Sequence, residues 1–352
     1  MKNYPLQKVF SQIFFKFARI NFGIFCFRLY KIHAEFSFFG MKILRIIFAL
    51  FAAALCFGCA QNAQKKIAFA HGKSIHYWGD HENKIMCEIL AGAANSAFKG
   101  KAQADVVSLE DGADFSALEK YDVIYVVSEG EKFHPFAGKS DVLKKLHSLK
   151  KNFAFIHYST NPTTGEPEEH TIQELIGGVY KTHFSVNPTY EARFEFAPHP
   201  ISRGVKPFAI TDEIYFNISF AENAKIAHIA KVVPPDKVRK FKFGAHSGNQ
   251  VVRDNMGRAE TVVWACENPN ETRGFGCTAG HAVWLLKNPD FFKMLLNSSA
   301  WLAGIEIPSG GFGAQTPSFD EIAKKIEKET RPDIEYYTKK WLEQIGSWET
   351  LN

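Results

Sequence analysis

One stretch near the middle of the chain, residues 151–161, restricts the fold more than any other. Residues 153–156 are all apolar, which is typical of a strand buried on both faces inside a parallel sheet. Polar side chains follow at once, from His157 to Asn161. In open α/β sheets, ligands bind beyond the carboxyl ends of the strands. The stretch therefore predicts a parallel α/β sheet with His157 at its functional edge.

The segments around this strand alternate between strand and helix patterns. Residues 65–72 and 122–128 are short apolar runs. A helix is expected over 80–98, where apolar side chains recur at helical spacing and Asp80 has the residue type of an N-cap. The remaining elements of this half are a strand over 104–109 and helices over 139–149 and 168–176. Such alternation is typical of a doubly wound, parallel sheet.

From residue 191 onward the pattern changes to strands with a period of two. The expected strands are 192–197, 214–220, 225–232, 261–266 and 274–281. The first three of them favour antiparallel pairing, or an extension at one edge of the sheet. Residues 234–258 are predicted to be a loop-rich insertion. An amphipathic helix over 289–302, with a proline near its first position, closes the domain.

The first 59 residues are predicted to lie outside the fold. Residues 1–40 are rich in Phe and contain one acid, and we interpret them as an upstream extension. Residues 41–59 have a basic start and an apolar run of signal-peptide length, short for a membrane span. The end at Cys59 resembles a bacterial lipobox, although Cys56 departs from that pattern. We expect an exported, periplasmic protein; lipidation at Cys59 and an uncleaved membrane anchor stay open.

The main domain is predicted to span residues 65–308. Residues 309–352 follow as a glycine-rich linker and a charged, helical C-terminal tail. Of six cysteines, Cys87, Cys266 and Cys277 fall in the main domain and form no CxxC pair. We expect them to be buried free thiols.

The charge pattern excludes some classes of partner. The net charge of +5 comes partly from the basic N-terminal residues, and the main domain shows no basic stripe interleaved with aromatics. We therefore expect no nucleic-acid partner, and contact with a membrane only through the leader or a lipid anchor. The first strand is not followed by GxGxxG, and the glycines around Phe275 lack the lysine of a P-loop. NAD is not expected as a cofactor.

Seven motifs lie in order along the main domain. They are 76–82 (HYWGDHE), 155–158 (FIHY), 176–187 (IGGVYKTHFSVN), 199–205 (HPISRGV), 212–215 (DEIY), 246–248 (HSG) and 273–281 (RGFGCTAGH). Together they resemble the ThuA-like (trehalose utilisation) family. The resemblance implies a flavodoxin-like α/β fold of the class I glutamine amidotransferase-like superfamily. The expected fold is thus a doubly wound, mainly parallel sheet with an antiparallel strand extension.

The resemblance also implies a role in sugar metabolism. It points to trehalose-related or 3-keto sugars and to hydrolase, isomerase or lyase chemistry; a non-catalytic carbohydrate-binding protein of the cell envelope is the alternative. Class I amidotransferases place a nucleophilic cysteine after a central strand, with a distant histidine as base. Here His157 and Tyr158 stand at that place, and His281 resembles the base. A cysteine-dependent amidotransferase is therefore disfavoured.

Imidazoles and carboxylates are expected to converge around His157. The candidates for this group are His71, His76, His81, Glu82, His183, Asp212, Glu213 and His281. We take His157, His281 and Glu213 as catalytic, Glu213 because it resembles the family's acidic residue. Adjacent side chains in a strand point to opposite faces, so Asp212 and Glu213 are not expected to act as a glycosidase pair.

Two chemistries stay open for this group. Imidazole nitrogen and carboxylate oxygen suit a divalent metal such as Zn²⁺ or Mn²⁺, for which the candidate ligands are His157, His183 and His281. Such a metal would polarise a sugar carbonyl or lower the pKa of bound water. Without a metal, His157 and His281 would act as general acid and base.

The expected partner is a small-molecule sugar, with a homo-oligomer left open. The substrate-binding candidates are His76, His81, Glu82, Tyr158, His183, Asn187, Tyr215 and His246. Rings among them would cover the faces of the sugar, and polar groups would meet its hydroxyls. Structural alternatives exist for several histidines: His71 as a turn cap, His81 as a first-turn helix residue and His246 as part of a solvated loop.

Overall fold

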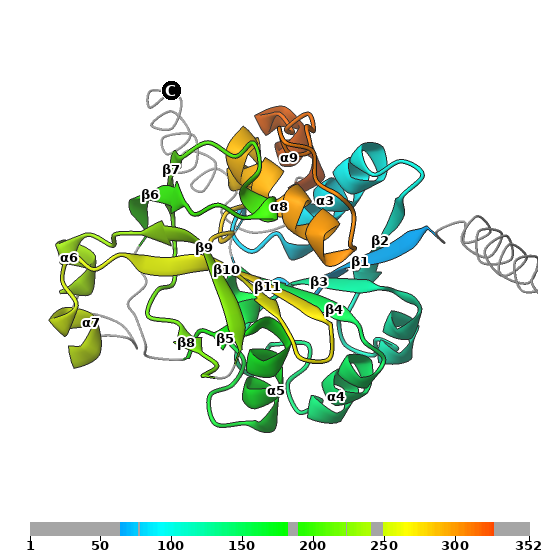
Figure 1. Cartoon of the computed structure of the whole chain (residues 1–352), viewed down its shortest axis with the longest axis horizontal. Coiled ribbons are helices and arrows are strands. Elements are labelled where there is room, and N and C mark those ends of the chain that lie inside the picture. The colour runs from blue at the N-terminus through cyan, green and yellow to red at the C-terminus, as the bar shows by residue number, and fades with distance from the viewer. Residues whose placement is uncertain (1–63, 77, 182–188, 223, 241–248, 327–352) are drawn as a thin grey trace, which may run out of the picture. The chain divides into compact units, whose positions relative to one another are not determined.

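The computed structural model in Figure 1 describes residues 64–326, except for 77, 182–188, 223 and 241–248. The chain divides into two units, Met1–Ala63 and Gln64–Asn352, and the described residues all belong to the second. The predicted extension and leader therefore lie outside the described residues. So does the tail beyond residue 326.

Five parallel strands form one half of the main sheet. They are β1 (Lys65–His71), β2 (Ala102–Ser108), β3 (Val123–Val127), β4 (Asn152–Ile156) and β11 (Arg273–Cys277). Their order, β2-β1-β3-β4-β11, is that of a flavodoxin-like sheet with β11 in the fifth place. Because these strands are parallel, β1, β3, β4 and β11 all end at the same edge of the sheet.

Antiparallel strands extend the sheet beyond β11. They are, in spatial order, β10 (Glu260–Glu267), β9 (Lys225–Val232), β6 (Tyr190–Phe196) and β7 (Phe208–Asp212). Each neighbouring pair from β11 to β7 is antiparallel, so β7 runs in the same direction as β11. The chain that leaves β7 therefore starts at the same edge as the ends of the parallel strands. This arrangement confirms the predicted fold class.

The prediction of a strand over 214–220 is wrong. The strand in this part of the chain is β7, which ends at Asp212, before the predicted range. Within 214–220 only β8 (Ser219–Phe220) is a strand, and it pairs with β5 (Gly178–Val179). Residues 214–216 are all buried, whereas a strand with one buried face would alternate. Asn217 then takes a left-handed φ of 58°, which ends any extended conformation.

Helices cover both faces of the sheet (Figure 1). On one face lie α3 (Asn83–Ala97), α8 (Pro289–Leu302) and α9 (Phe319–Ile326), and on the other α4 (Ser140–Ser148) and α5 (Pro167–Ile176). The predicted insertion carries two short helices, α6 (Asp236–Arg239) and α7 (Gln250–Asp254). Short 3₁₀ segments are η1 (Phe115–Lys120), η2 (His157–Thr160), η3 (Pro200–Ser202) and η4 (Val283–Lys287).

Local sequence signals explain where α5 and α8 begin and end. Pro289 occupies the first turn of α8, and the Asn288 side chain accepts hydrogen bonds from the next two free amides, as an N-cap does. Gly177 ends α5 with a left-handed φ of 79°, and a Cβ atom there would lie 2.9 Å from the Cβ of Cys266.

The start of α3 differs from the prediction. The helix begins at Asn83, not at Asp80, which instead forms an isolated antiparallel bridge with Ala282. His81 has a left-handed φ of 48°, so it cannot continue a helix. The segment before α3 is thus tied to the chain after β11 rather than to its own helix.

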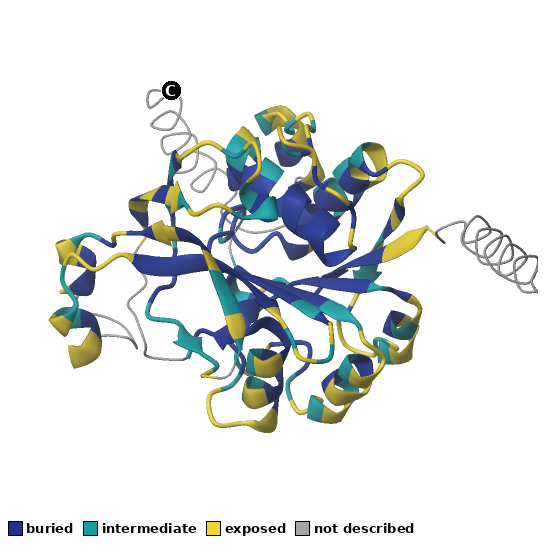
Figure 2. Ribbon diagram, in the orientation of Figure 1, coloured by how far each residue is buried: buried dark blue, intermediate teal, exposed yellow. Residues whose placement is uncertain are grey.

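The core lies in two layers, one on each side of the sheet (Figure 2). In β4, Phe153 and Phe155 pack with α4 and α5, while Ala154 and Ile156 pack with α3 and α8. The prediction that this strand is buried on both faces is confirmed. So is the prediction for the main-domain cysteines, which are free and buried. Within the described ranges, no helix combines the length and the apolar character that crossing a membrane requires.

Candidate functional site

Four titratable side chains meet at the edge where the parallel strands end. His157 directly follows β4, and His281 lies four residues beyond β11. His81 ends the segment between β1 and α3, and Glu213 follows β7. Because β1, β4, β7 and β11 all end at this edge, segments distant in the sequence deliver their side chains to one place.

The ligand atoms of these four residues all lie within 4.8 Å of one another. His81 Nε2 is 3.0 Å from His157 Nε2 and 3.0 Å from His281 Nδ1. Glu213 Oε2 lies 3.3 Å from His281 Nδ1 and 3.6 Å from His157 Nε2. We call His81, His157, His281 and Glu213 the imidazole cluster.

The other nitrogen of each ring faces an oxygen. His157 Nδ1 is 2.9 Å from the Thr278 carbonyl oxygen, and His81 Nδ1 is 2.8 Å from Glu129 Oε2. His281 Nε2 is 3.3 Å from Asp80 Oδ1. A carbonyl or ionised carboxylate oxygen only accepts, so each of these nitrogens carries the proton. In a neutral ring the remaining nitrogen then presents a lone pair, and the three lone pairs point into the cluster.

Lone pairs cannot face one another at 3.0 Å without a positive charge between them. The charge could be a proton on one of the rings or a metal cation. Three imidazole nitrogens and one carboxylate oxygen are a ligand set that suits divalent transition metals. The residues present therefore fit a metal ion.

The electrostatics of the cluster divides between its residues: burial holds the pKa of His81 well below its usual range, whereas two carboxylates nearby are kept ionised. Burial opposes ionisation of Glu129, but hydrogen bonds from His76 and His81 outweigh it and lower its pKa to about 2. Burial likewise opposes ionisation of Glu213, whose pKa His157 and His281 nevertheless hold well below its usual range. Burial alone would lower the pKa of His281, yet Asp80 and Glu213 raise it well above its usual range. Both buried carboxylates thus remain ionised beside the histidines that they contact.

Two cluster histidines have unusual backbone conformations. His81 and His157 take left-handed φ angles of 48° and 52°. For residues other than glycine such conformations cost on the order of 1 kcal/mol or more, and they gather at functional sites. At His157 the sharp turn also allows the Ser159 hydroxyl to accept from the Ile156 N–H at 2.7 Å.

The adjacent acids Asp212 and Glu213 have separate tasks. Asp212 is fully buried, and its Oδ2 accepts hydrogen bonds from the backbone N–H groups of Gly280 and His281 at 2.8 and 3.3 Å. Glu213 instead approaches the His281 ring. One acid thus fixes the backbone of His281 and the other faces its imidazole, in keeping with the expectation that the two do not form a carboxylate pair.

Aromatic side chains surround the imidazole cluster. The Tyr215 ring stacks on His157 with centroids 4.7 Å apart, and its hydroxyl donates to Glu213 Oε2 at 3.2 Å. Tyr180 stacks on the far side of Tyr215 at 4.5 Å. Tyr158 is half-buried, with its ring centroid 5.6 Å from that of His81. These rings give one side of the site an apolar wall.

His76 lies at the more open side of the cluster. Its side chain is 32% exposed, its ring lies 3.7 Å from that of His81, and its Nδ1 is 3.0 Å from Glu129 Oε1. His76, His81 and Glu129 form a second group of possible ligands. Here, however, a carboxylate lies between two ring nitrogens, and two N–H donors satisfy it without a metal.

Most of the predicted site residues that the structure describes do come together. Those near the cluster are His76, His81, His157, His281, Glu213, Tyr158 and Tyr215. Glu82 accepts from the Gly79 N–H at 2.9 Å and so supports its own turn. The predicted convergence of His71 is wrong: its Nδ1 lies 3.4 Å from Glu110 Oε1, and Glu110 follows β2, which lies on the side of β1 away from β3 and β4. His183, Asn187 and His246 lie outside the described residues.

Sequence reasoning missed two acids that hold the rings. The sequence pattern assigns no role to Glu129, and it favours Asp80 as an N-cap. A signal existed for Glu129, since it follows β3 closely, as His157 follows β4. Asp80 offered none, because its contact with His281 depends on pairing between segments 200 residues apart.

Comparisons with known proteins agree with this architecture. The model of the ThuA family, described as trehalose utilisation, matches residues 73–302. A search of curated protein sequences found no significant match.

Several solved structures are similar to this chain. A ThuA-like protein from Bacteroides uniformis is 14% identical, with a TM-score of 0.48, and the match covers 69% of this chain and 93% of that one. A ThuA-like protein from Parabacteroides merdae is 13% identical, with a TM-score of 0.49 and coverages of 72% and 98%. A glutamine amidotransferase from Thermotoga maritima is 10% identical, with a TM-score of 0.36 and coverages of 69% and 90%.

Proposed function

The chain belongs to the ThuA family, described as trehalose utilisation, and from this premise we propose that it acts on a sugar or sugar derivative at a metal centre. The metal is held by His81, His157, His281 and Glu213. The substrate is trehalose-related or a 3-keto sugar, and the reaction is a hydrolase, isomerase or lyase reaction. Export through residues 41–59 would place this reaction in the periplasm.

One observation supports the metal above all: three ring lone pairs and one carboxylate oxygen converge within 4.8 Å. The three outer nitrogens are fixed by Thr278, Glu129 and Asp80. Metal-binding histidines usually donate their second N–H to such a carboxylate or carbonyl, which fixes the tautomer and the ring orientation. The cluster therefore has both the ligands and the supporting acceptors of a metal site.

A metal bound there would polarise a sugar oxygen or lower the pKa of a bound water. The side chains of this protein supply the rest. Tyr215 donates to Glu213 and so orients its carboxylate. His76, which Glu129 holds and which is partly exposed, is suited to exchange a proton with a sugar hydroxyl. Tyr158 offers a ring beside the cluster against which a sugar face can pack.

The first test is the metal content of the purified chain, prepared without a histidine tag. Mass spectrometry should find about one divalent metal per chain, or Zn²⁺ or Mn²⁺ should bind at that ratio when added. His81→Ala should weaken binding by at least about 100-fold, the upper range for loss of a supporting group. His71→Gln is the matched control, since His71 also lies at the end of a parallel strand but pairs with Glu110.

The second test follows trehalose and a 3-keto glycoside by NMR with the metal-loaded chain. Conversion that His81→Ala abolishes and His71→Gln retains supports the proposal. Sugar binding without conversion would favour the carbohydrate-binding alternative. A chain that binds neither Zn²⁺ nor Mn²⁺ would refute the metal centre and leave acid–base catalysis by His157 and His281.

A further inference from the structure

Three aromatic rings from distant parts of the chain contact one another near the segments that carry His81 and His281. Trp284 lies 4.5 Å from Phe319 between ring centroids, with the planes 15° apart. Trp284 also lies 5.1 Å from Trp78. Both Trp side chains are buried, whereas Phe319 is half-buried. Trp284 therefore contacts both other rings, stacked on Phe319 and tilted by 49° against Trp78, and so joins three segments.

Two of these segments supply metal ligands in the proposed site. Trp78 stands three residues before His81, and Trp284 stands three residues after His281. The segments pair directly: the His81 N–H donates to the His281 carbonyl oxygen at 2.7 Å, and the Val283 N–H donates to that of Gly79 at 3.0 Å. The Trp78–Trp284 contact lies at the end of this pairing, so it is suited to fix the separation of the two ligands.

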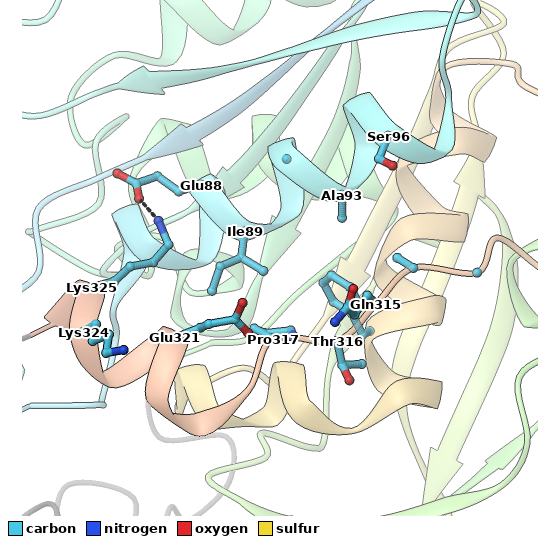
Figure 3. A pocket seen from close by; sticks show the side chains of 14 residues that line it. Glu88, Ile89, Ala93, Ser96, Gln315, Thr316, Pro317, Glu321, Lys324 and Lys325 are labelled. Carbon is cyan, nitrogen blue, oxygen red and sulfur yellow. Dashed lines mark hydrogen bonds and ion pairs between the residues drawn. The ribbon is translucent and has the colours of Figure 1, made fainter.

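The third ring belongs to α9, which lies beyond the residues that the family model matches. Ile322 and Ile326 of α9 are completely buried, and Lys325 forms an ion pair with Glu88 of α3 at 2.8 Å (Figure 3). A groove of about 520 Å³ between α3, α9 and the preceding linker shows that this side of α9 is not packed closely. Besides the buried apolar side chains of α9, the Phe319–Trp284 contact links this helix to the segment that follows His281.

We propose that Phe319 is a positioning residue for the metal centre. Its ring covers Trp284 and holds the Trp78–Trp284 pair, which keeps the His81 and His281 segments in register. The role of Phe319 at a metal centre rests on the proposed function, which supplies the metal ion that His81 and His281 bind. The packing role itself can be measured without any metal.

Aromatic stacking supports this assignment. A stacked pair contributes beyond the burial of its area, and its geometry is more restricted than that of an aliphatic contact. Removing the Phe319 ring leaves one face of Trp284 without its partner, so that ring can tilt. Mutation of a group that supports a metal ligand typically lowers metal affinity by about 10–100-fold, and displacement of the ligand segments is expected to reach the lower end of that range.

The test uses the full chain and a matched pair of variants. Phe319→Ala removes the ring over Trp284. Phe312→Ala removes another ring of the same C-terminal segment, one that packs at 4.7 Å on Phe98 at the end of α3 rather than on Trp284. Both variants lose a buried ring contact, so a general loss of stability affects both. Phe319→Tyr keeps the stack and should behave as the unmodified chain.

The first measurement is hydrogen–deuterium exchange of the metal-free chain. Phe319→Ala should speed exchange at the His81 and Val283 amides, whereas Phe312→Ala should leave these two slow. Equal exchange in the two variants would overturn the proposal. If Phe319→Ala does not fold, Phe319→Leu replaces it, since Leu retains apolar volume but cannot stack.

The second measurement is Zn²⁺ affinity by competition with a chromophoric chelator. Phe319→Ala should bind about 10-fold more weakly than Phe312→Ala. Equal affinities would contradict the positioning role. If the unmodified chain binds no metal, the proposed function fails, and the exchange experiment still decides whether Phe319 positions the two segments.

Discussion

A single buried carboxylate, Glu129, orients two of the histidines at the site. It is completely buried, and its two oxygens approach the ring nitrogens of His76 and His81 at 2.8 to 3.0 Å. It also accepts from the Ile75 N–H at 3.1 Å. One residue thereby sets the tautomer of a proposed ligand and the place of the partly exposed imidazole beside it.

We expect Glu129→Gln to weaken Zn²⁺ binding by about 10–100-fold, the usual effect of losing a supporting carboxylate. The neutral amide supplies no negative charge to the His81 N–H, and its NH₂ group cannot accept. Chelator competition measures the change. Glu110→Gln, which removes the acid beside His71 instead, should leave the affinity unchanged. Equal losses in the two variants would contradict the assignment of Glu129.

His134 is a buried histidine with a purely structural geometry. Its Nε2 donates to the Ser159 carbonyl oxygen at 3.1 Å, and its Nδ1 accepts from the Phe136 N–H at 3.2 Å. Burial lowers its pKa to about 4. The unfolded chain, with a histidine pKa of about 6.5, therefore binds a proton in a range where the folded chain does not.

Stability should accordingly fall as the pH falls from about 6.5 to 4, by up to about 3 kcal/mol from this residue. His134→Gln should be less stable at pH 7, and its free energy of unfolding should depend less on pH, because the contribution of His134 is missing. Urea unfolding at pH 7, 5.5 and 4.5 measures both effects. His170→Gln, at an exposed position, should keep the full slope; the same slope in His134→Gln would refute the prediction.

At the scale of single elements, β11 positions the segment with His281, and it can pair with β10 because Gly276 has no side chain. Gly276 lies against the buried Trp264 ring, and a Cβ atom there would lie 2.1 Å from its Cζ2. That ring cannot retreat freely, since its Nε1 donates to the Ile176 carbonyl oxygen at 2.8 Å. The glycine thus allows β10 and β11 to pair while α5 stays packed over them.

Gly276→Ala should lower the free energy of unfolding by about 1–3 kcal/mol through overpacking. Gly92 provides the opposite case, because a Cβ atom in this part of α3 meets nothing within 4 Å. Gly92→Ala should raise the free energy of unfolding by about 0.5–1 kcal/mol. Urea denaturation compares the two. If both substitutions changed the free energy of unfolding in the same direction, the space around each glycine would not determine the effect, and the prediction would be wrong.

At the scale of the whole molecule, metal binding and folding are expected to be coupled. The ligands come from segments that follow four different strands, so the site exists only in the folded chain. A metal at 100 times its dissociation constant stabilises the folded state by about 2.7 kcal/mol. Burial lowers the pKa of His281, but Asp80 and Glu213 outweigh it and raise this pKa, so a proton competes with the metal at lower pH.

Zn²⁺ should therefore raise the midpoint of thermal unfolding more at pH 8 than at pH 6. A chelator should reverse the rise, and His281→Ala should abolish it at both pH values. Thermal unfolding followed by circular dichroism measures these shifts. An equal rise at pH 6 and pH 8 would show that the bound metal displaces no proton and would contradict the site as assigned.

The sequence by itself determined the fold class and several elements. The apolar run at 153–156, the Pro289 helix start and the alternation of strands and helices are local patterns, and the chain folds as they predict. It also marked His157 and His281, because a polar residue just after a buried strand is visible in one dimension. The strand expected over 214–220 failed because burial of three successive side chains overrode local pattern.

Only the tertiary structure decided the composition of the site. His81 and Glu213 were among the residues expected near His157, but that these two reach it while His71 does not depends on strand order and direction. The same holds for the contacts of Glu129 and Asp80 with the rings and of Phe319 with Trp284. Sequence patterns report which residues are buried, but they do not report which strand ends become neighbours. Those neighbours are set by the packing of the entire sheet, since β7 reaches this edge only through successive antiparallel pairings.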